Sequence, residues 1–145
     1  MAKHDQAERF HAGTLTDGWR WFGSHPDKKN GAEGWTFRVW APHAQSVCVV
    51  GDFNSWTDGV HPLTRDGGIW EGFIPGLGEY TSYKYAVTGP DGEVRLKTDP
   101  YAFHCETRPA TAGKLYDIEG FNWTDAAFLA KLAKHPVYDS PLNIY

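Results

Sequence analysis

The stretch from residue 35 to residue 56, WTFRVWAPHAQSVCVVGDFNSW, constrains the fold more than any other part of the chain. Its first half alternates between two faces, and one face collects four apolar side chains: Trp35, Phe37, Val39 and Ala41. This period of two is typical of a half-buried strand. Pro42 ends the run, because proline has no N–H for a sheet, and a second run of strand-forming residues follows at 47–50. The stretch predicts two strands and then a turn-forming loop at 51–56.

Strand-like runs continue beyond this stretch. Alternating patterns predict further strands over 69–75, 82–88 and 93–97, with turn residues between them. Short strands at intervals of roughly 8–12 residues favour an all-β sandwich. No helical segment alternates with the strands, as a parallel α/β fold would require. The predicted fold class is therefore all-β, an immunoglobulin-like β-sandwich.

The sandwich is predicted to follow an N-terminal arm. Residues 1–30 form this arm, in which three aromatic side chains need burial: Trp19, Trp21 and Phe22. The charged segment 26–31 is interpreted as a solvated turn that leads into the first strand. Residues 31–117 form the sandwich itself, and a chain of 145 residues is long enough for one such domain.

The last part, residues 118–145, is predicted to be a short helix followed by a linker. Apolar side chains at helical spacing mark the helix: Phe128, Leu129 and Leu132. Thr124 is interpreted as its N-terminal cap, and His135-Pro136 as its end. The final four residues, 142–145, are interpreted as the beginning of another strand.

Charge and apolar pattern exclude several classes of partner. The net charge is −4 and no basic block occurs, so nucleic-acid binding is not expected. No run approaches the ~20 apolar residues that a membrane span needs, and the N-terminus lacks the apolar segment of a signal peptide. We therefore expect a cytoplasmic protein. Cys48 and Cys105 lack the spacing of a metal site and are expected to be reduced thiols.

The sequence offers no catalytic or metal site. Its 18 acidic residues are scattered through turns, where an aspartate usually bonds its own backbone, so no catalytic residue is assigned. Its seven histidines are dispersed, without the pairing that a metal site needs. No glycine-rich phosphate loop follows a strand, so no cofactor is expected.

The remaining candidate chemistry is sugar binding. Trp56 ends a polar loop, where an indole offers a flat apolar face for a pyranose ring. Asn54 lies beside it, and Lys84 falls on the opposite strand face from Tyr83 and Tyr85, free to reach a hydroxyl. Trp56, Asn54 and Lys84 are therefore the candidate carbohydrate-binding residues. The alternative is that Trp56 packs against the arm or a neighbouring domain, as most aromatic residues here are needed for packing.

Six motifs occur in the order in which one protein family carries them. They are FGSH (22–25), FRVWAP (37–42), VVGDFNSW (49–56), GIWEGFIPG (68–76), YKY (83–85) and KTDPYAFHCETRP (97–109). With these motifs nearly the whole chain resembles the N-terminal carbohydrate-binding module, family 48, of α-amylase-superfamily enzymes. The resemblance is closest to 1,4-α-glucan branching enzymes, which act on glycogen.

This resemblance implies a part of a larger enzyme. The parent would cut an α-1,4-glucan and rejoin the piece through an α-1,6 bond, and the family's catalytic carboxylates lie in a (β/α)₈ barrel beyond Tyr145. The chain would then orient the barrel and hold polymer, and would be inactive alone. Its implied partners are α-1,4-glucan, as glycogen, amylose or maltooligosaccharides, and the barrel of the same protein.

The resemblance also bears on the candidate sugar-binding residues. In the related glycogen-binding module of the AMP-activated kinase β subunit, the tryptophan and lysine that match Trp56 and Lys84 contact glucan. That module has a second stacking tryptophan just after an Asp-Gly turn. Here the turn Asp91-Gly92 is followed by Glu93 and Val94, so weaker binding is expected.

Two alternatives to a branching enzyme remain open at this point. The module could belong to another barrel enzyme of the superfamily, such as isoamylase or a trehalose-forming hydrolase. It could instead be a non-enzymatic adaptor that binds glucan or a protein partner.

Overall fold

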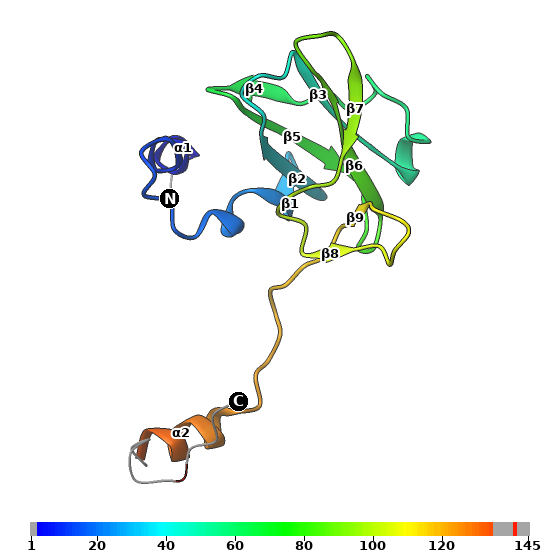
Figure 1. Cartoon of the computed structure of the whole chain (residues 1–145). Helices are drawn as coiled ribbons and strands as arrows, with labels where there is room; N and C mark the ends of the chain where they lie inside the picture. The colour runs from blue at the N-terminus through cyan, green and yellow to red at the C-terminus, as the bar shows by residue number, and fades with distance from the viewer. Residues whose placement is uncertain (1–2, 135–140, 142–145) are drawn as a thin grey trace.

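The computed structural model describes residues 3–134 and residue 141. In this part of the chain two antiparallel sheets face each other, and α-helices occur only before and after them (Figure 1). The prediction of an all-β sandwich is confirmed. In chain order the elements are α1 (Lys3–His11), the 3-10 turn η1 (Gly18–Arg20), β1 (Gly23–Lys29), β2 (Ala32–Trp40), β3 (Ser46–Gly51), the 3-10 turn η2 (Asp52–Asn54), β4 (Thr64–Asp66), β5 (Ile69–Pro75), β6 (Ser82–Thr88), β7 (Val94–Lys97), β8 (His104–Cys105), β9 (Gly113–Lys114) and α2 (Ala126–Lys134).

Each sheet joins strands that are distant in the sequence. The first sheet has the order β1-β2-β5-β4. In the second sheet β6 pairs with β3 on one side and with β7 and β9 on the other, and β8 pairs with β9. The chain changes sheets between β2 and β3 and returns between β3 and β4. The loop that carries Trp56 is therefore a crossing between the two sheets.

Strand β1 corrects the prediction for residues 26–31. The expected solvated turn is instead the second half of β1, Gly23–Lys29, which pairs in register with β2 across the two-residue turn Asn30-Gly31. Both turn residues have positive φ, 52° and 81°, as a type I′ hairpin requires. On the face that carries Ser24 the next residue is Pro26 rather than an apolar strand former. The sequence of this edge strand therefore lacks the apolar alternation that marks the others.

The core between the sheets follows the predicted alternation. Trp35, Phe37 and Tyr83 are buried, and the rings of Phe37 and Tyr83 meet edge to face across the two sheets at 5.2 Å. The other buried members of this cluster are Val39, Ala44, Val47, Val49, Leu63, Trp70, Ile74, Tyr85 and Leu115. The buried indole N–H groups have acceptors, since Trp35 donates to the carbonyl of Leu77 and Trp70 to that of Ala41.

The N-terminal arm packs on one edge of the sandwich. Trp21 and Phe22 are buried there with Ile69, as their need for burial predicted. Phe22 stacks on Tyr101 with the ring centroids 5.3 Å apart. Trp19 differs from the expectation, because 40% of it is exposed and it contacts the edge of a phenylalanine ring.

A buried carboxylate joins the two sheets. Oδ2 of Asp99 accepts hydrogen bonds from the hydroxyls of Tyr83 (2.6 Å) and Tyr85 (3.1 Å), and Oδ1 accepts one from the N–H of Tyr101. The hydroxyls of Tyr83 and Ser24, from the second and first sheets, lie 3.1 Å apart. Burial raises the pKa of the Asp99 carboxyl. Burial, followed by the nearby charge of Asp99, holds the pKa of both tyrosines well above 10. We call these four residues, Ser24, Tyr83, Tyr85 and Asp99, the Asp99 clamp.

Helix α2 lies apart from the sandwich at the end of an extended segment (Figure 1). It begins at Ala126, and the carbonyl of Asp125 accepts its first hydrogen bond, from Leu129. Asp125 rather than the predicted Thr124 thus precedes the helix. The predicted helix end at His135-Pro136 and the predicted final strand at 142–145 lie outside the described residues.

Both α-helices are short. Each has nine residues, and among the residues that the structure describes no helix has the length and apolar character needed to cross a membrane.

Candidate functional site

The loop after β3 holds Trp56 in an unusual backbone conformation. Ser55 and Trp56 have φ of 53° and 59°, in the left-handed region that residues other than glycine rarely adopt. The N–H of Trp56 donates to the carbonyl of Gly51 at 2.9 Å, which closes the loop onto the end of β3. A strained conformation of this kind persists only where surrounding contacts hold it.

The indole of Trp56 is held at its polar edge and is partly exposed. Its Nε1 donates to Oδ1 of Asp52 at 3.0 Å, and 37% of the residue is exposed. Asp52 was not among the predicted site residues. The only sequence signal for it is the four-residue spacing to Trp56 within the loop.

Asn54 stabilises the same loop. Its Oδ1 accepts the N–H of Gly51, and its Nδ2 lies 2.9 Å from the carbonyl of Val49 and 3.0 Å from Nδ1 of His61. An amide side chain has two donor hydrogens and two acceptor lone pairs. Three of these four positions are engaged within the protein. The second lone pair of Oδ1 has no hydrogen-bond partner among the described residues.

Lys84 lies at the same end of the second sheet. It is on β6, opposite Val50 of β3, and so is one register step from Gly51, whose carbonyl anchors Trp56. As predicted, its side chain lies on the face opposite to the buried tyrosines. Its Nζ donates to Oγ1 of Thr111 at 2.7 Å, a contact between residues 27 positions apart that the local sequence did not reveal.

The outer face of this sheet is apolar beneath the loop. Cys48, Val50 and Ala86 form a small buried cluster there. Burial raises the pKa of the Cys48 thiol, and a hydrogen bond with Asp58 raises it further. The neutral thiol packs like a small apolar side chain. On the adjacent strand β7, Val94 is 49% exposed, so this position offers an aliphatic group rather than an aromatic ring.

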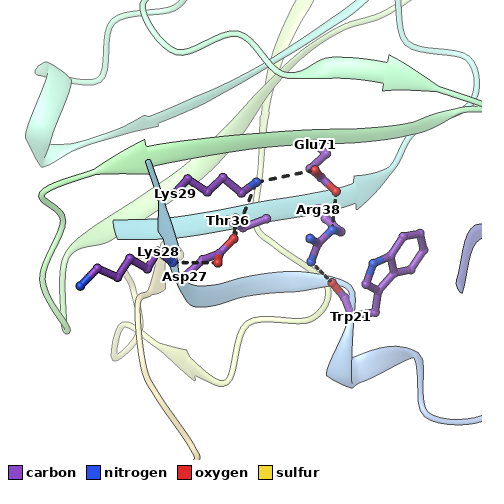
Figure 2. Close-up of polar contacts among 7 residues, drawn as sticks. All are labelled: Trp21, Asp27, Lys28, Lys29, Thr36, Arg38 and Glu71. Carbon is purple, nitrogen blue, oxygen red and sulfur yellow. Dashed lines mark hydrogen bonds and ion pairs between the residues drawn. The ribbon is translucent and has the colours of Figure 1, made fainter. Parts of the chain in front are cut away.

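The first sheet carries a network of paired charges on its outer face (Figure 2). Arg38 of β2 bonds to Glu71 of β5 at 2.5 Å. Nζ of Lys29 lies 3.6 Å from the carboxylate of Asp27 and 3.9 Å from that of Glu71. A hydrogen bond from Thr36 lowers the pKa of Asp27. Because a cation lies between the two carboxylates, this network holds three strands together and is not arranged as a catalytic acid pair.

A metal centre would require carboxylate, histidine or cysteine side chains to cluster in the part of the chain that the structure describes. Within residues 3–134 and 141, no group of three or more histidine, cysteine, aspartate or glutamate side chains could hold an ion. The turn interpretation holds for Asp58 and Asp91, whose carboxylates accept backbone N–H groups one and two residues on.

Comparison with known proteins adds to this geometry. Residues 21–102 match the model of carbohydrate-binding module 48, the isoamylase N-terminal domain. The 1,4-alpha-glucan branching enzyme GlgB of Bacillus subtilis (strain 168) is 48% identical over 138 residues, which are 94% of this chain and 22% of that protein. The GlgB of Geobacillus stearothermophilus is 46% identical over 138 residues, again 94% and 22%. The chain thus spans about a fifth of the length of these relatives.

Solved structures give the same picture of the fold. A pullulanase from Bacillus acidopullulyticus superposes with a TM-score of 0.52 and 27% identity, over 66% of this chain and 12% of that one. Ligand-free PulA from Klebsiella pneumoniae gives a TM-score of 0.50 and 32% identity, over 66% and 9%. Because the family model covers more than half of the chain, including the Trp56 loop and Lys84, the chain belongs to the carbohydrate-binding module 48 family, the isoamylase N-terminal domains.

Proposed function

We propose that the chain is the N-terminal glucan-binding and orienting module of a 1,4-α-glucan branching enzyme, which forms α-1,6 branches in glycogen by transglycosylation. The observation that carries the proposal is the 48% identity to a branching enzyme over 94% of the chain. The Klebsiella pullulanase reaches 32% over 66%. The match to the branching enzyme thus has a higher sequence identity and covers more of the chain.

In this proposal the chain binds α-1,4-glucan at the outer end of the second sheet. The indole of Trp56 stacks on the C–H face of a glucose ring, because its edge is held by Asp52 and its faces are not used by that bond. Lys84 donates to sugar hydroxyls, exchanging its bond to Thr111 for a ligand. Asn54 contributes its remaining lone pair and otherwise keeps the loop in shape.

The transfer chemistry belongs, in this proposal, to the rest of the protein. Retaining transfer between sugars needs two carboxylates about 5–5.5 Å apart that face the scissile bond. In the described part of the chain, the carboxylates of Asp27 and Glu71 are both paired with Lys29. The chain therefore acts on the position of the polymer rather than on its bonds.

A second candidate is a module of a debranching enzyme such as a pullulanase or isoamylase. The superposition on pullulanases and the name of the matching family favour it. A domain exchange separates the two. Replacing the matching N-terminal region of the Bacillus subtilis enzyme by this chain should preserve branching of amylose, and the same exchange in the Bacillus acidopullulyticus pullulanase should impair its activity. The reverse result would favour the second candidate.

The glucan-binding role is tested by titrating the chain with maltoheptaose. We expect a dissociation constant near 1 mM, equivalent to about −4 kcal/mol, because one stacked ring and one charged donor act without a second tryptophan. Trp56→Ala should abolish binding at the Trp56 loop without changing the circular dichroism spectrum. Trp123→Ala is the matched control, since Trp123 is 77% exposed in the segment between the sandwich and α2. Equal binding by the chain and its Trp56→Ala variant would contradict the proposal.

We also propose a cytoplasmic location. Cys48 and Cys105 are both free thiols, and Cys105 is exposed. Exposed thiols persist in reducing compartments. Finding the parent protein in the culture medium or periplasm of its source cells would contradict this.

A further inference from the structure

A groove on the outer face of the first sheet has no role in the functions proposed above. It lies between α1 and the strands β4 and β5, with a volume of about 800 Å³. Pockets for small molecules usually measure roughly 300–1,000 Å³. Two cross-strand pairs form its floor, Thr64 with Glu71 and Asp66 with Ile69. The remaining lining residues are Trp21, Gly67 and, from α1, Ala7, Glu8 and His11.

Helix α1 and the turn after β4 approach each other closely beside the groove. A Cβ built at Gly67, in the turn between β4 and β5, would lie 3.2 Å from Nε2 of His11. Gly67 has a φ of 56°, so a side chain there would strain the backbone as well as crowd His11. The imidazole therefore sits against a turn that carries no side chain. This contact sets one wall of the groove.

The groove and the Trp56 loop lie on opposite sides of the sandwich. In Figure 1 α1 is on one side, and the blue-green helical turn after β3 is on the other. The strands that floor the groove belong to the first sheet, whereas Lys84 is on the outer face of the second. A ligand bound in the groove would therefore be separate from a ligand stacked on Trp56.

The lining chemistry suits a ligand rich in hydrogen-bond donors. The largely buried Trp21 and Ile69 lie among a threonine hydroxyl, an imidazole and three carboxylates. One of these carboxylates, that of Glu71, is already paired with Arg38 and Lys29. No lysine or arginine is among the lining residues, so an anion is disfavoured. Sugar hydroxyls donate to carboxylates, and the C–H faces of a pyranose ring suit apolar surface.

We propose that this groove binds an oligosaccharide, which gives the chain a second glucan site besides Trp56. The inference rests on the proposed function for its choice of ligand, because the lining alone accepts any neutral polyol. Two sites on opposite faces would let one module hold two polymer strands, or two segments of one strand.

Nuclear magnetic resonance of the backbone amides during titration with maltoheptaose tests both sites at once. Two separate clusters should shift, one at residues 51–57 and 84 and one at residues 7–11 and 64–69. In the Trp56→Ala variant only the second cluster should remain. Adding Asp66→Ala to that variant should weaken the remaining binding about three- to tenfold, as expected for one lost hydrogen bond. Adding Glu33→Ala instead, which removes an exposed carboxylate at the far end of β2, should not.

The outcomes distinguish this inference from the proposed function. Shifts confined to residues 51–57 and 84 would overturn the groove site and leave glucan binding at Trp56 intact. No shift in either cluster would overturn both. Loss of both clusters in Trp56→Ala would show that the groove shifts were transmitted from the other face, and would overturn the second site. If the amides at residues 7–11 and 64–69 shifted with spermidine but not with maltoheptaose, the groove would bind a cation. That result would overturn the proposal of a saccharide site.

Discussion

The indole N–H of Trp56 donates a 3.0 Å hydrogen bond to the carboxylate of Asp52, four residues earlier in the same loop. Between them Ser55 has a left-handed backbone, as Trp56 does. The ring is thus held in place before any ligand arrives. A ligand that stacks on a fixed ring loses less of its binding free energy to ordering of the protein.

Asp52→Ala should weaken maltoheptaose binding about three- to tenfold, because the indole would then have to be ordered on binding. Asp52→Asn keeps an oxygen acceptor for the indole and should bind like the parent chain. Amide shifts at residue 56 during a titration give both affinities. Equal binding by the alanine variant and the parent would show that the loop backbone alone positions the ring.

Lys84→Met should cost about 1.5–3 kcal/mol of binding free energy, the usual contribution of a hydrogen bond from a charged donor. The variant keeps an unbranched apolar chain one atom shorter, so the apolar cluster beneath should stay packed. Thr111→Val is the control. It removes the internal partner of Lys84 and should leave binding unchanged or improve it, since Nζ then has no bond to give up. Weaker binding in Thr111→Val would mean that Thr111 itself contacts glucan.

Tyr83 and Tyr85 should ionise only when the protein unfolds. Their pKa values are held well above 10 by burial and by Asp99. A group whose pKa is raised in the folded state contributes stability that is present below its unfolded pKa and lost as pH rises through the folded value. The free energy of unfolding should therefore fall as pH rises above about 10.

Absorbance of tyrosinate during an alkaline titration checks this. Two of the seven tyrosines should ionise, with a rise in tyrosinate absorbance, at the pH at which the circular dichroism signal is lost. In the double variant Tyr83→Phe, Tyr85→Phe that late step should be absent. Ionisation of all tyrosines before unfolding would contradict the burial of the Asp99 clamp.

Removing residues 121–145 should reduce binding of a dye that reports exposed apolar surface. Five large apolar side chains in the described part of that segment are more than half exposed: Phe121, Trp123, Phe128, Leu129 and Leu132. Exposed apolar groups of this size mark an interaction surface. The thermal unfolding midpoint should change little. A large drop in that midpoint would mean that the segment packs on the sandwich.

The isolated chain should not branch amylose. An iodine-staining assay should show unchanged amylose with the pure chain and a loss of blue colour with a full-length branching enzyme. Conversion by the pure chain would show that a pair of carboxylates within it performs the transfer.

The fold was predictable wherever alternation reflects a face turned to the core. The assignment of Tyr83 and Tyr85 to the interior and Lys84 to the exterior needed only the period of two. Strand β1 was missed because it is an edge strand with few apolar residues, although Asn30-Gly31 is a recognisable hairpin turn. The position of α2 was predictable from its apolar spacing, but the helix begins one residue later than the predicted cap at Thr124 implied.

The sequence suggested the residues of the candidate site but not the contacts that hold them in place. The placement of Trp56 in a polar loop suggested an exposed ring, and the structure leaves it partly exposed. The bond from Trp56 to Asp52 depends on the left-handed backbone of Ser55 and Trp56. Serine and tryptophan rarely adopt this conformation, so the sequence did not predict it. The partner of Lys84 comes from a loop far along the chain, which no local pattern can identify. Whether the three predicted residues bind sugar stays a prediction.

The Asp99 clamp also has a consequence for synthesis of the chain on the ribosome. It ties Ser24 to residues 83, 85 and 99, and the core is complete only with Leu115, which is fully buried. Translation adds about 5–20 residues per second, so on the order of ten seconds separates the emergence of Ser24 from that of Leu115. During this interval β2 and β3 are exposed without their full set of partners. The nascent chain therefore has its greatest need of chaperones before residue 115 emerges, and a pause in translation upstream of that point would lengthen the exposure.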